Sequence, residues 1–211
     1  MIITIDGPAA SGKSSVAKLL AKRLKIAFVS SGLLYRAATY LALKADIDLD
    51  NEELLVTMLN EYEIRLEPSP TKNHKITLSG QDISEYLHTD KIDANVSQLA
   101  LHPKVRDWVD ERLRAIKGTF VIEGRDMGAK VFKHAHYKFY LTASPEVRAK
   151  RRLDERLIDL KEMIASLIAR DKKDHKQLKP AEDAIFIATD QLSLDEVVEI
   201  IYQKISHGKD F

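Results

Sequence analysis

Cysteine is absent from this chain of 211 residues, and its absence excludes disulfide bonds and thiolate metal sites. A chain without disulfides suits a reducing compartment, so we expect a cytoplasmic protein. Long hydrophobic runs are missing too. The first apolar segment, residues 1–5, is followed by Asp6, and no run approaches the ~18 apolar residues of a membrane-spanning helix. We therefore expect neither a signal peptide nor a membrane association.

A large excess of either charge is also missing, since 33 lysine and arginine residues stand against 32 aspartate and glutamate residues. A nucleic-acid-binding domain usually carries a basic excess, so this balance argues against nucleic acid as a partner. Hydrophobic residues make up 45% of the chain, which at this length is enough for one well-formed core. We expect a monomer.

Strand-like and helix-like segments alternate along the chain. Short apolar runs predict buried strands, at residues 2–5, 26–29, 119–124, 137–141 and 184–189. Apolar residues at helical spacing predict helices between and after these strands, including residues 32–45, 95–116 with Pro103 as a break or new start, and a helix ending near Arg170. This alternation predicts an α/β fold of three layers, a parallel sheet flanked by helices.

Three helix starts carry capping signals. Asn51 stands before a helix with apolar residues at 54, 55, 58 and 59, and asparagine is a favoured N-cap. Ser144 followed by Pro145 predicts a cap and a first helical residue. "SLDE", residues 193–196, is a capping box in front of the closing helix.

Residues 62–82 differ in kind from their surroundings. They alternate apolar and polar residues around a tip rich in proline, serine and asparagine, which predicts a β-hairpin with one exposed side. An antiparallel hairpin within a chain of alternating strands and helices predicts a small insert attached to the main sheet.

The first turn of the chain carries the strongest motif. "GPAASGKS", residues 7–14, matches G-x-x-x-x-G-K-[ST] and lies between a predicted strand and a predicted helix. Backbone N–H groups of such a loop bind phosphate, the lysine reaches the β- and γ-phosphates, and the serine hydroxyl binds Mg²⁺. The alternative is a glycine-rich turn that only joins strand to helix. We expect a site for ATP with Mg²⁺, formed by Gly7, Pro8, Ala9, Ala10, Ser11, Gly12, Lys13, Ser14 and Ser15, with Ser14 on the metal and Lys13 as an exposed loop lysine.

Other motifs narrow the class of protein. The Asn-Lys-x-Asp element that reads guanine in GTPases is absent, and 211 residues leave little room for the second lobe of a motor or transporter ATPase. A small-molecule kinase needs arginines on separate elements to hold two anionic substrates. The chain has them in "SSGLLYR", "EGRDMG", "RAKRR" and "RDKKD". The alternatives are a solvated helix face for residues 148–152, a simple helix cap for Ser31, and a strand exit for "RDMG".

Together these motifs resemble bacterial cytidylate kinases. "TIDGPAASGKSSVAK", "SSGLLYR", "EGRDMG", "LTASPEVRAKRR", "RDKKD" and "LSLDEV" occur in that family's order and rough spacing, and the resemblance extends from residue 2 to about residue 201, hairpin insert included. The resemblance implies transfer of the γ-phosphoryl group of ATP to CMP or dCMP, with weaker use of UMP.

The resemblance also implies roles for single residues. The acceptor phosphate would be held by Ser31, Tyr35, Arg36 and Arg125, cytosine by Ser97, Arg106 and Asp126, and the ribose by Arg170 and Asp174. Lys13, Arg36, Arg125, Arg148 and Arg152 would be the catalytic residues, and residues 189–192 would lie near adenine. A carboxylate such as Asp126 complements cytosine, because it accepts from the N4 amine.

The resemblance further implies a division of the chain. The core would comprise residues 1–30, 117–150 and 171–211, the monophosphate-binding region with its insert residues 31–116, and the lid residues 151–170. Two positions depart from the family pattern, Ser30 in place of an aspartate and Gln177 in place of an arginine. Three other functions remain open: a P-loop kinase with another acceptor, a non-catalytic ATP-binding regulator, and a nucleic-acid-associated module.

Overall fold

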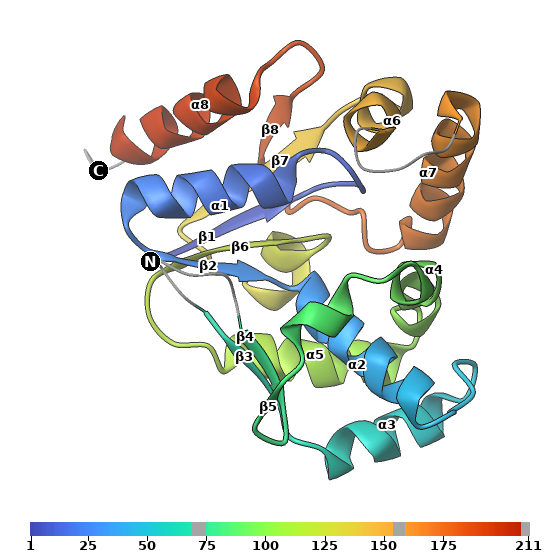
Figure 1. Cartoon of the computed structure of the whole chain (residues 1–211). Helices are drawn as coiled ribbons and strands as arrows, with labels where there is room; N and C mark the ends of the chain where they lie inside the picture. The colour runs from blue at the N-terminus through green and yellow to red at the C-terminus, as the bar shows by residue number, and fades with distance from the viewer. Residues whose placement is uncertain (69–74, 154–158, 208–211) are drawn as a thin grey trace. The chain divides into compact units, whose positions relative to one another are not determined.

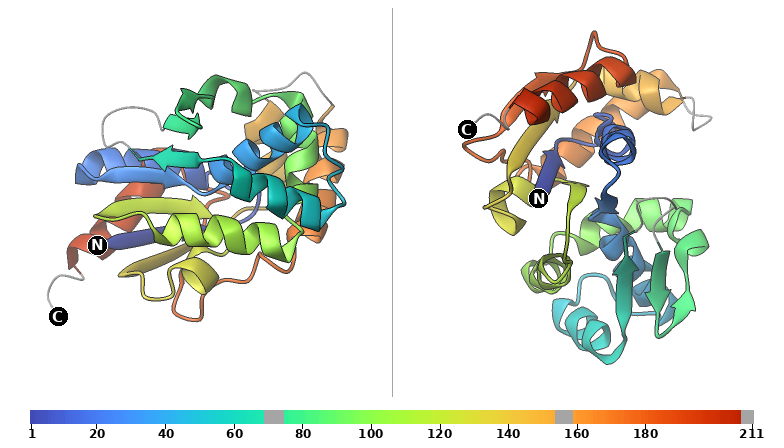
Figure 2. Two further views of the ribbon diagram at one scale, coloured as in Figure 1. Left: turned by 90° about the horizontal axis from the view of Figure 1, so that it is seen from below. Right: turned by 90° about the vertical axis from the view of Figure 1, so that its left-hand side faces the viewer.

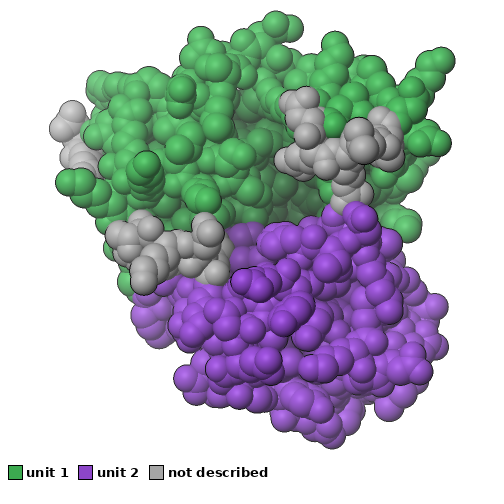
Figure 3. All heavy atoms as spheres, in the orientation of Figure 1, with its two compact units in different colours: residues 1–28, 118–211 green, residues 29–117 purple. Residues whose placement is uncertain are grey.

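The computed structural model describes residues 1–68, 75–153 and 159–207. Two compact units divide the chain: unit 1 comprises residues 1–28 and 118–211, and unit 2 residues 29–117. Figure 3 colours them separately. The predicted hairpin tip and residues 154–158 of the predicted lid lie outside the described residues. The functional division into core, monophosphate-binding region and lid stays a prediction.

A sheet with the strand order β2-β6-β1-β7-β8 forms the centre of the fold. Its strands are β1 (Ile2–Asp6), β2 (Ala27–Ser30), β6 (Phe120–Gly124), β7 (Tyr137–Thr142) and β8 (Ile185–Ala188). β1 pairs in parallel with β6 and with β7, and β7 pairs in parallel with β8. These pairings confirm the predicted parallel sheet with flanking helices. Each strand is a short apolar run, and helical segments connect it to the next strand of this sheet along the chain (Figure 1).

The two faces of the sheet in unit 1 are covered differently. Helices α1 (Lys13–Leu24) and α8 (Leu194–His207) bury one face, and Ile3 and Ile5 of β1 belong to that core with no exposed surface. Alternation along a strand turns Thr4 and Asp6 to the other face. There lies a π-helical turn, η2 (Met127–Val131), which Figure 2 shows in its right-hand view. β1 therefore presents a polar pair of side chains to η2.

Helices α6 (Pro145–Leu153) and α7 (Leu160–Asp174) pack against each other at the phosphate-loop end of unit 1. Their small apolar core contains Ala149, Met163 and Leu167, together with Ala9 of the loop. The phosphate loop therefore packs against the same small core as these two helices.

Unit 2 contains helices and a small antiparallel sheet. The elements are α2 (Gly32–Lys44), α3 (Glu52–Glu61), β3 (Ile64–Glu67), β4 (Lys75–Leu78), β5 (Gln81–Asp82), a 3₁₀ turn η1 (Ser84–Leu87), α4 (Asp90–Leu99) and α5 (Pro103–Arg114). β4 pairs with β3 on one side and with β5 on the other, both antiparallel. The predicted antiparallel insert is thus present, with a third short strand that the sequence pattern did not indicate.

The capping signals in the sequence correctly predicted the start of three helices. Asn51 accepts from the backbone N–H of Leu54, 3.1 Å away. The capping box is formed, since Ser193 Oγ accepts from the N–H of Glu196 and the Glu196 carboxylate accepts from the N–H of Ser193. Ser144 Oγ accepts from Val147 N at 3.4 Å.

Three details of the secondary structure differ from the prediction. The helical segment expected from residue 95 begins five residues earlier, at Asp90, because Thr89 caps α4; the predicted new start at Pro103 is confirmed, since α5 begins there. α7 continues to Asp174 rather than ending near Arg170. The "RDMG" segment leads into η2 instead of a plain loop.

Over the described part of the chain, none of the helices has the length and apolar character needed to span a membrane.

Candidate active site

The phosphate loop, residues 7–14, joins β1 to α1 in unit 1. Gly7 and Gly12 have φ of 152° and 90°, in the region that favours glycine. A Cβ on Gly7 would lie 2.4 Å from the carbonyl oxygen of Leu141, so a larger residue does not fit. α1 begins at Lys13, and the first N–H groups of a helix lack partners within it. This combination is typical of an anion-binding loop.

Lys13 is buried, with 8% of its surface exposed, so the expectation of an exposed loop lysine is wrong. Its Nζ donates to the carbonyl oxygen of Pro8 at 3.0 Å. Burial, and after it the charge of Arg125, lowers the pKa of Lys13 to about 7, while Glu123 acts in the opposite direction. Near neutral pH the lysine can therefore gain a proton when an anion approaches.

Asp6 stands at the end of β1 and is 4% exposed. Its Oδ1 accepts from Met127 N at 2.9 Å and its Oδ2 from Gly128 N at 2.8 Å. Burial raises the pKa of Asp6 to about 7 despite these two bonds. The charge of Asp126 also raises it and that of Lys13 lowers it. The carboxyl group thus joins the phosphate-loop strand to the segment that carries Asp126.

Arg125 follows β6 and is held by two partners in unit 1. Its Nε donates to Asp174 Oδ2 at 3.0 Å, and Nη1 donates to the carbonyl oxygen of Gly7 at 2.9 Å. Arg170 Nε lies 3.8 Å from the same Asp174 oxygen. Asp126, the next residue, is buried with 7% exposed. The predicted phosphate ligand and the two predicted ribose ligands therefore lie together at the phosphate loop.

Arg148 is almost fully buried, at 3% exposure. Its guanidinium donates to both carboxylate oxygens of Asp171, at 3.1 and 2.6 Å. It also donates to the carbonyl oxygens of Ala9 at 3.1 Å and Ala143 at 3.0 Å. The solvated-face alternative is wrong for Arg148, which ties α7 to the phosphate loop, whereas Arg152 is half-buried on α6.

The loop after β8, predicted to lie near adenine, is tied to α6. Arg151 donates to the hydroxyl of Thr189 at 3.0 Å and to its carbonyl oxygen at 2.5 Å. Asp190 accepts from Ser144 N at 2.8 Å. A Cβ on Gly12 would lie 3.9 Å from Arg151 Nη1, so this arginine lies beside the phosphate loop as well.

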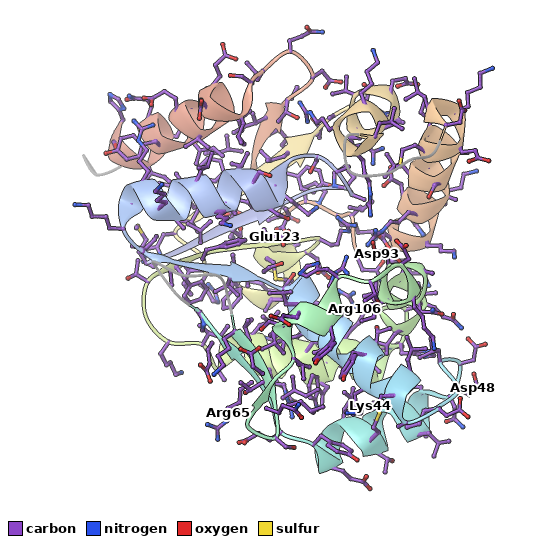
Figure 4. All side chains as sticks on the ribbon, in the orientation of Figure 1. Lys44, Asp48, Arg65, Asp93, Arg106 and Glu123 are labelled. Atoms are coloured by element: carbon purple, nitrogen blue, oxygen red, sulfur yellow. The ribbon has the colours of Figure 1, made fainter. Side chains whose placement is uncertain are left out.

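In unit 2, Arg36 of α2 is paired with a carboxylate. It donates to Asp93 Oδ1 at 2.5 Å and to the carbonyl oxygen of Leu87 at 2.8 Å. The side chains of Arg36 and Asp93 are 19% and 16% exposed, and Figure 4 shows Asp93 on α4. Burial, and next the charge of Arg36, lowers the pKa of His88. A positive charge on His88 is thus disfavoured beside Arg36.

The other predicted ligands of unit 2 lie on α2, α4 and α5. Arg106 is buried and donates to the carbonyl oxygen of Ala100 at 3.4 Å. Its guanidinium lies 5.7 Å from the ring centroid of Tyr35, within the range of a cation–π contact. Ser31 is buried at the N-cap of α2 but makes no capping bond with its side chain, so the simple-cap alternative is wrong. Ser97 is half-buried on α4.

The residues present fit a magnesium ion that binds through the nucleotide. Ser14 is exposed in the first turn of α1, and its hydroxyl is the kind of hard oxygen that Mg²⁺ takes together with phosphate oxygens and water. Among the residues described, no group of three or more His, Cys, Asp or Glu could hold a metal ion. A metal at Ser14 would therefore depend on phosphate for most of its ligands.

The motifs did not indicate four contacts that involve Asp93 in unit 2 and Asp6, Asp171 and Arg151 in unit 1, the last through Thr189. Asp93, Asp171 and Arg151 each contact a predicted site residue or loop from a distant segment. Asp6 contacts the two residues that follow Asp126. A charged residue at the end of a buried strand, as Asp6 is, was the one signal available in the sequence.

The family model and similar curated proteins point to the same family. The family model described as cytidylate kinase matches residues 3–207. A cytidylate kinase of Deinococcus radiodurans is 51% identical over 97% of this chain and 99% of its own length. Cytidylate kinases of Deinococcus deserti and Thermus thermophilus are 49% and 48% identical, over 97% and 93% of this chain and 99% and 94% of their own lengths.

Solved structures with a similar fold include shikimate kinase from Bacteroides thetaiotaomicron. It is 12% identical, with a TM-score of 0.51 over 98% of both chains. At this identity the likeness concerns the fold alone.

Proposed function

The chain belongs to the cytidylate kinase family, and from that premise we propose that it transfers the γ-phosphoryl group of ATP to CMP and dCMP, with weaker use of UMP. One observation carries the proposal. The family match covers residues 3–207, and every residue assigned to a substrate above falls within that range.

The phosphate loop of unit 1 is proposed to hold ATP. Its N–H groups and the N-terminus of α1 would bind the phosphates, with Lys13 as a point charge on the β- and γ-phosphates. Mg²⁺, held by Ser14 and by phosphate oxygens, would neutralise charge on the nucleotide. Adenine would lie near residues 189–192, which Arg151 fixes through Thr189.

CMP is proposed to bind the residues that the resemblance to the family assigns to it. Arg125, with Ser31, Tyr35 and Arg36, would hold its phosphate, and Arg170 and Asp174 its ribose. Cytosine would be read by Ser97, Arg106 and Asp126, since a carboxylate accepts from the N4 amine. Uracil presents an oxygen at that position, so the same carboxylate would disfavour UMP.

The proposed chemistry needs no general base. A phosphate monoester has a second pKa of about 6, so the acceptor is largely a dianion at pH 7 and is already a nucleophile. What remains is to hold two polyanions in line and to balance their charge. Lys13, Arg36 and Arg125 supply positive charge for this. The assignment of Arg148 and Arg152 to the transferring group stays a prediction.

Water has to be kept from the reacting phosphate, and a lid at residues 151–170 is proposed for this purpose. We further propose that the enzyme is a cytoplasmic monomer. The balanced charge of the chain and its lack of cysteine support this setting without a nucleic acid or membrane partner.

A coupled assay with Mg²⁺-ATP and a panel of monophosphates tests the proposal. We expect the highest kcat/KM for CMP or dCMP, a lower value for UMP, and negligible transfer to AMP and GMP. A purine monophosphate or a non-nucleotide as the best acceptor would contradict the assignment, and hydrolysis of ATP without any acceptor would contradict a transferase.

A further inference from the structure

Asp6 ends β1 directly before the phosphate loop, and none of the substrate contacts proposed above involves it. We propose that Asp6 is a positioning residue which fixes Asp126 for base selection, by accepting hydrogen bonds from the backbone N–H groups of residues 127 and 128. This inference rests on the proposed function, because it takes Asp126 as the residue that reads cytosine.

The first support is the geometry of the contact. The two carboxylate oxygens of Asp6 accept one bond each, from Met127 N at 2.9 Å and from Gly128 N at 2.8 Å. Asp6 is 4% exposed, so water competes little for these bonds. A carboxylate can bind two successive N–H groups in this way because both of its oxygens are acceptors, whereas an amide has one acceptor.

The second support is the local structure that this contact completes. η2 begins at Met127, directly after Asp126, and the first N–H groups of a helical turn lack partners within it. The carbonyl oxygen of Asp126 already accepts from Lys130 N at 2.8 Å. Asp6 therefore caps this turn from another strand, and the cap and the turn together fix the backbone that directly follows the Asp126 side chain.

The third support is the close approach of the same segment to β1. A Cβ on Gly128 would lie 2.8 Å from Thr4 Oγ1, a distance that real Cβ atoms do not adopt. Glycine at this position lets the segment rest against Thr4, two residues before Asp6 on the same face of the strand. Asp6 thus supplies the carboxylate, and glycine at position 128 supplies the space that the two hydrogen bonds require.

Arg125 is held by hydrogen bonds that do not involve Asp6, so its role can be separated from that of Asp126. Its side chain is held by Gly7 and Asp174, neither of which depends on the Asp6 carboxylate. Loss of that carboxylate should therefore disturb Asp126 more than Arg125. The expected consequence is a loss of base discrimination that exceeds the loss of phosphate binding.

Asp6→Asn is the direct test, because it keeps the shape and removes one acceptor. The amide NH₂ would then face a backbone N–H. We expect the CMP:UMP ratio of kcat/KM to fall roughly tenfold, the scale of one buried hydrogen bond lost. A purely structural role, or a change in the charge beside Lys13, would lower both substrates alike and leave the ratio unchanged. An unchanged ratio in a folded variant would overturn the inference.

A double-mutant cycle asks whether Asp6 acts through Asp126. In an Asp126→Asn background, Asp6→Asn should change the ratio no further, since the base reader is already lost. Equal and additive effects of the two changes would overturn the inference. Arg125→Ala is the matched control, and it should lower kcat/KM for CMP and UMP alike.

A second variant guards against misfolding of Asp6→Asn. Gly128→Ala should displace the same segment and reduce the ratio, and Thr4→Ala in the same chain should restore part of it by making room for the new methyl group. Failure of Gly128→Ala to change the ratio would contradict the inference.

Amide hydrogen exchange separates this inference from the proposed function. Exchange at Met127 and Gly128 should accelerate at least tenfold in Asp6→Asn, with or without nucleotides. If Asp126→Asn alone leaves the ratio unchanged, the assignment of Asp126 to cytosine fails, and exchange still decides whether Asp6 holds the segment. Unchanged exchange at both amides would overturn the inference whatever the kinetics show.

Discussion

The Nζ atom of Lys13 lies 3.0 Å from the carbonyl oxygen of Pro8, so this lysine folds back onto the loop that precedes it. Burial keeps its pKa near 7. A triphosphate is a stronger acceptor than a neutral carbonyl group, and its charge favours the protonated amine. We therefore expect Lys13 to exchange Pro8 for phosphate when ATP binds.

Replacing Lys13 by methionine should separate catalysis from stability. The apolar stem is kept while a desolvated amine is removed, so the thermal midpoint should stay within a few degrees of that of the original chain or rise. Phosphoryl transfer should fall by about 10²–10³-fold, as for other single preorganised charge contacts. Steady-state kinetics and thermal unfolding of the same preparation measure both effects.

Lys18→Met is a matched control for this variant. Lys18 lies on the same helix but is exposed, so transfer should remain close to that of the original chain. Near-normal turnover of Lys13→Met, with unchanged ATP dependence, would remove Lys13 from the mechanism.

The lowered pKa of Lys13 predicts proton uptake on ATP binding. Above pH 7 the lysine of the free protein is mainly neutral, and bound phosphate should return its pKa toward the ordinary value of 10.5. At pH 8, where ATP itself is fully ionised, binding should take up close to one proton. Calorimetry in two buffers with different ionisation enthalpies measures this number. Lys13→Met should abolish the uptake, and equal uptake in that variant would assign the proton to another group.

Arg148 is expected to stabilise the fold as well as to serve the reaction. Arg148→Ala removes the partner of Asp171 and the donors to Ala9 and Ala143. The Asp171 side chain is 26% exposed, so water can partly replace its lost partner. We therefore expect the free energy of unfolding by urea to fall by about 1–3 kcal/mol, the scale of polar groups left without their donor.

Arg152→Ala provides the comparison, because Arg152 lies on the same helix and is only half-buried. Its loss of stability should be clearly smaller than that of Arg148→Ala. Similar losses in the two variants would contradict a special structural role for Arg148.

How much of the fold and of the candidate site could be predicted depends on how far apart in the sequence the interacting residues lie. The caps at Asn51 and Ser193 and the phosphate loop were predictable, since their signals lie within a few residues. The hydrogen bonds from Met127 N to Asp6 and from Arg148 to Asp171 join residues 121 and 23 positions apart. No local pattern encodes such pairs, and for the same reason the burial of Lys13 was missed.

The resemblance described above implies an arginine at the position of Gln177, and we predict a gain from restoring it. Its Oε1 is buried and, within the described residues, accepts no hydrogen bond, while its backbone N–H donates to Asp174 at 2.9 Å. Gln177→Arg should lower the KM for CMP by roughly fivefold with little change in kcat, because a charged donor bonds more strongly than an amide.

Gln177→Met is the control for that substitution. It removes the unbonded acceptor without adding a donor, so stability should be equal or higher and the KM for CMP unchanged. A KM that is unchanged or raised in Gln177→Arg would show that the position does not contact the acceptor.

The most direct test of the account follows the phosphoryl group itself. ATP labelled at the γ-phosphate is incubated with the protein, Mg²⁺ and CMP, and the products are separated. The account predicts that the label appears as the β-phosphate of CDP in amounts equal to the ADP formed, and that Lys13→Met suppresses this transfer. Label found as free inorganic phosphate, or on an acceptor other than a pyrimidine monophosphate when several are offered together, would contradict it.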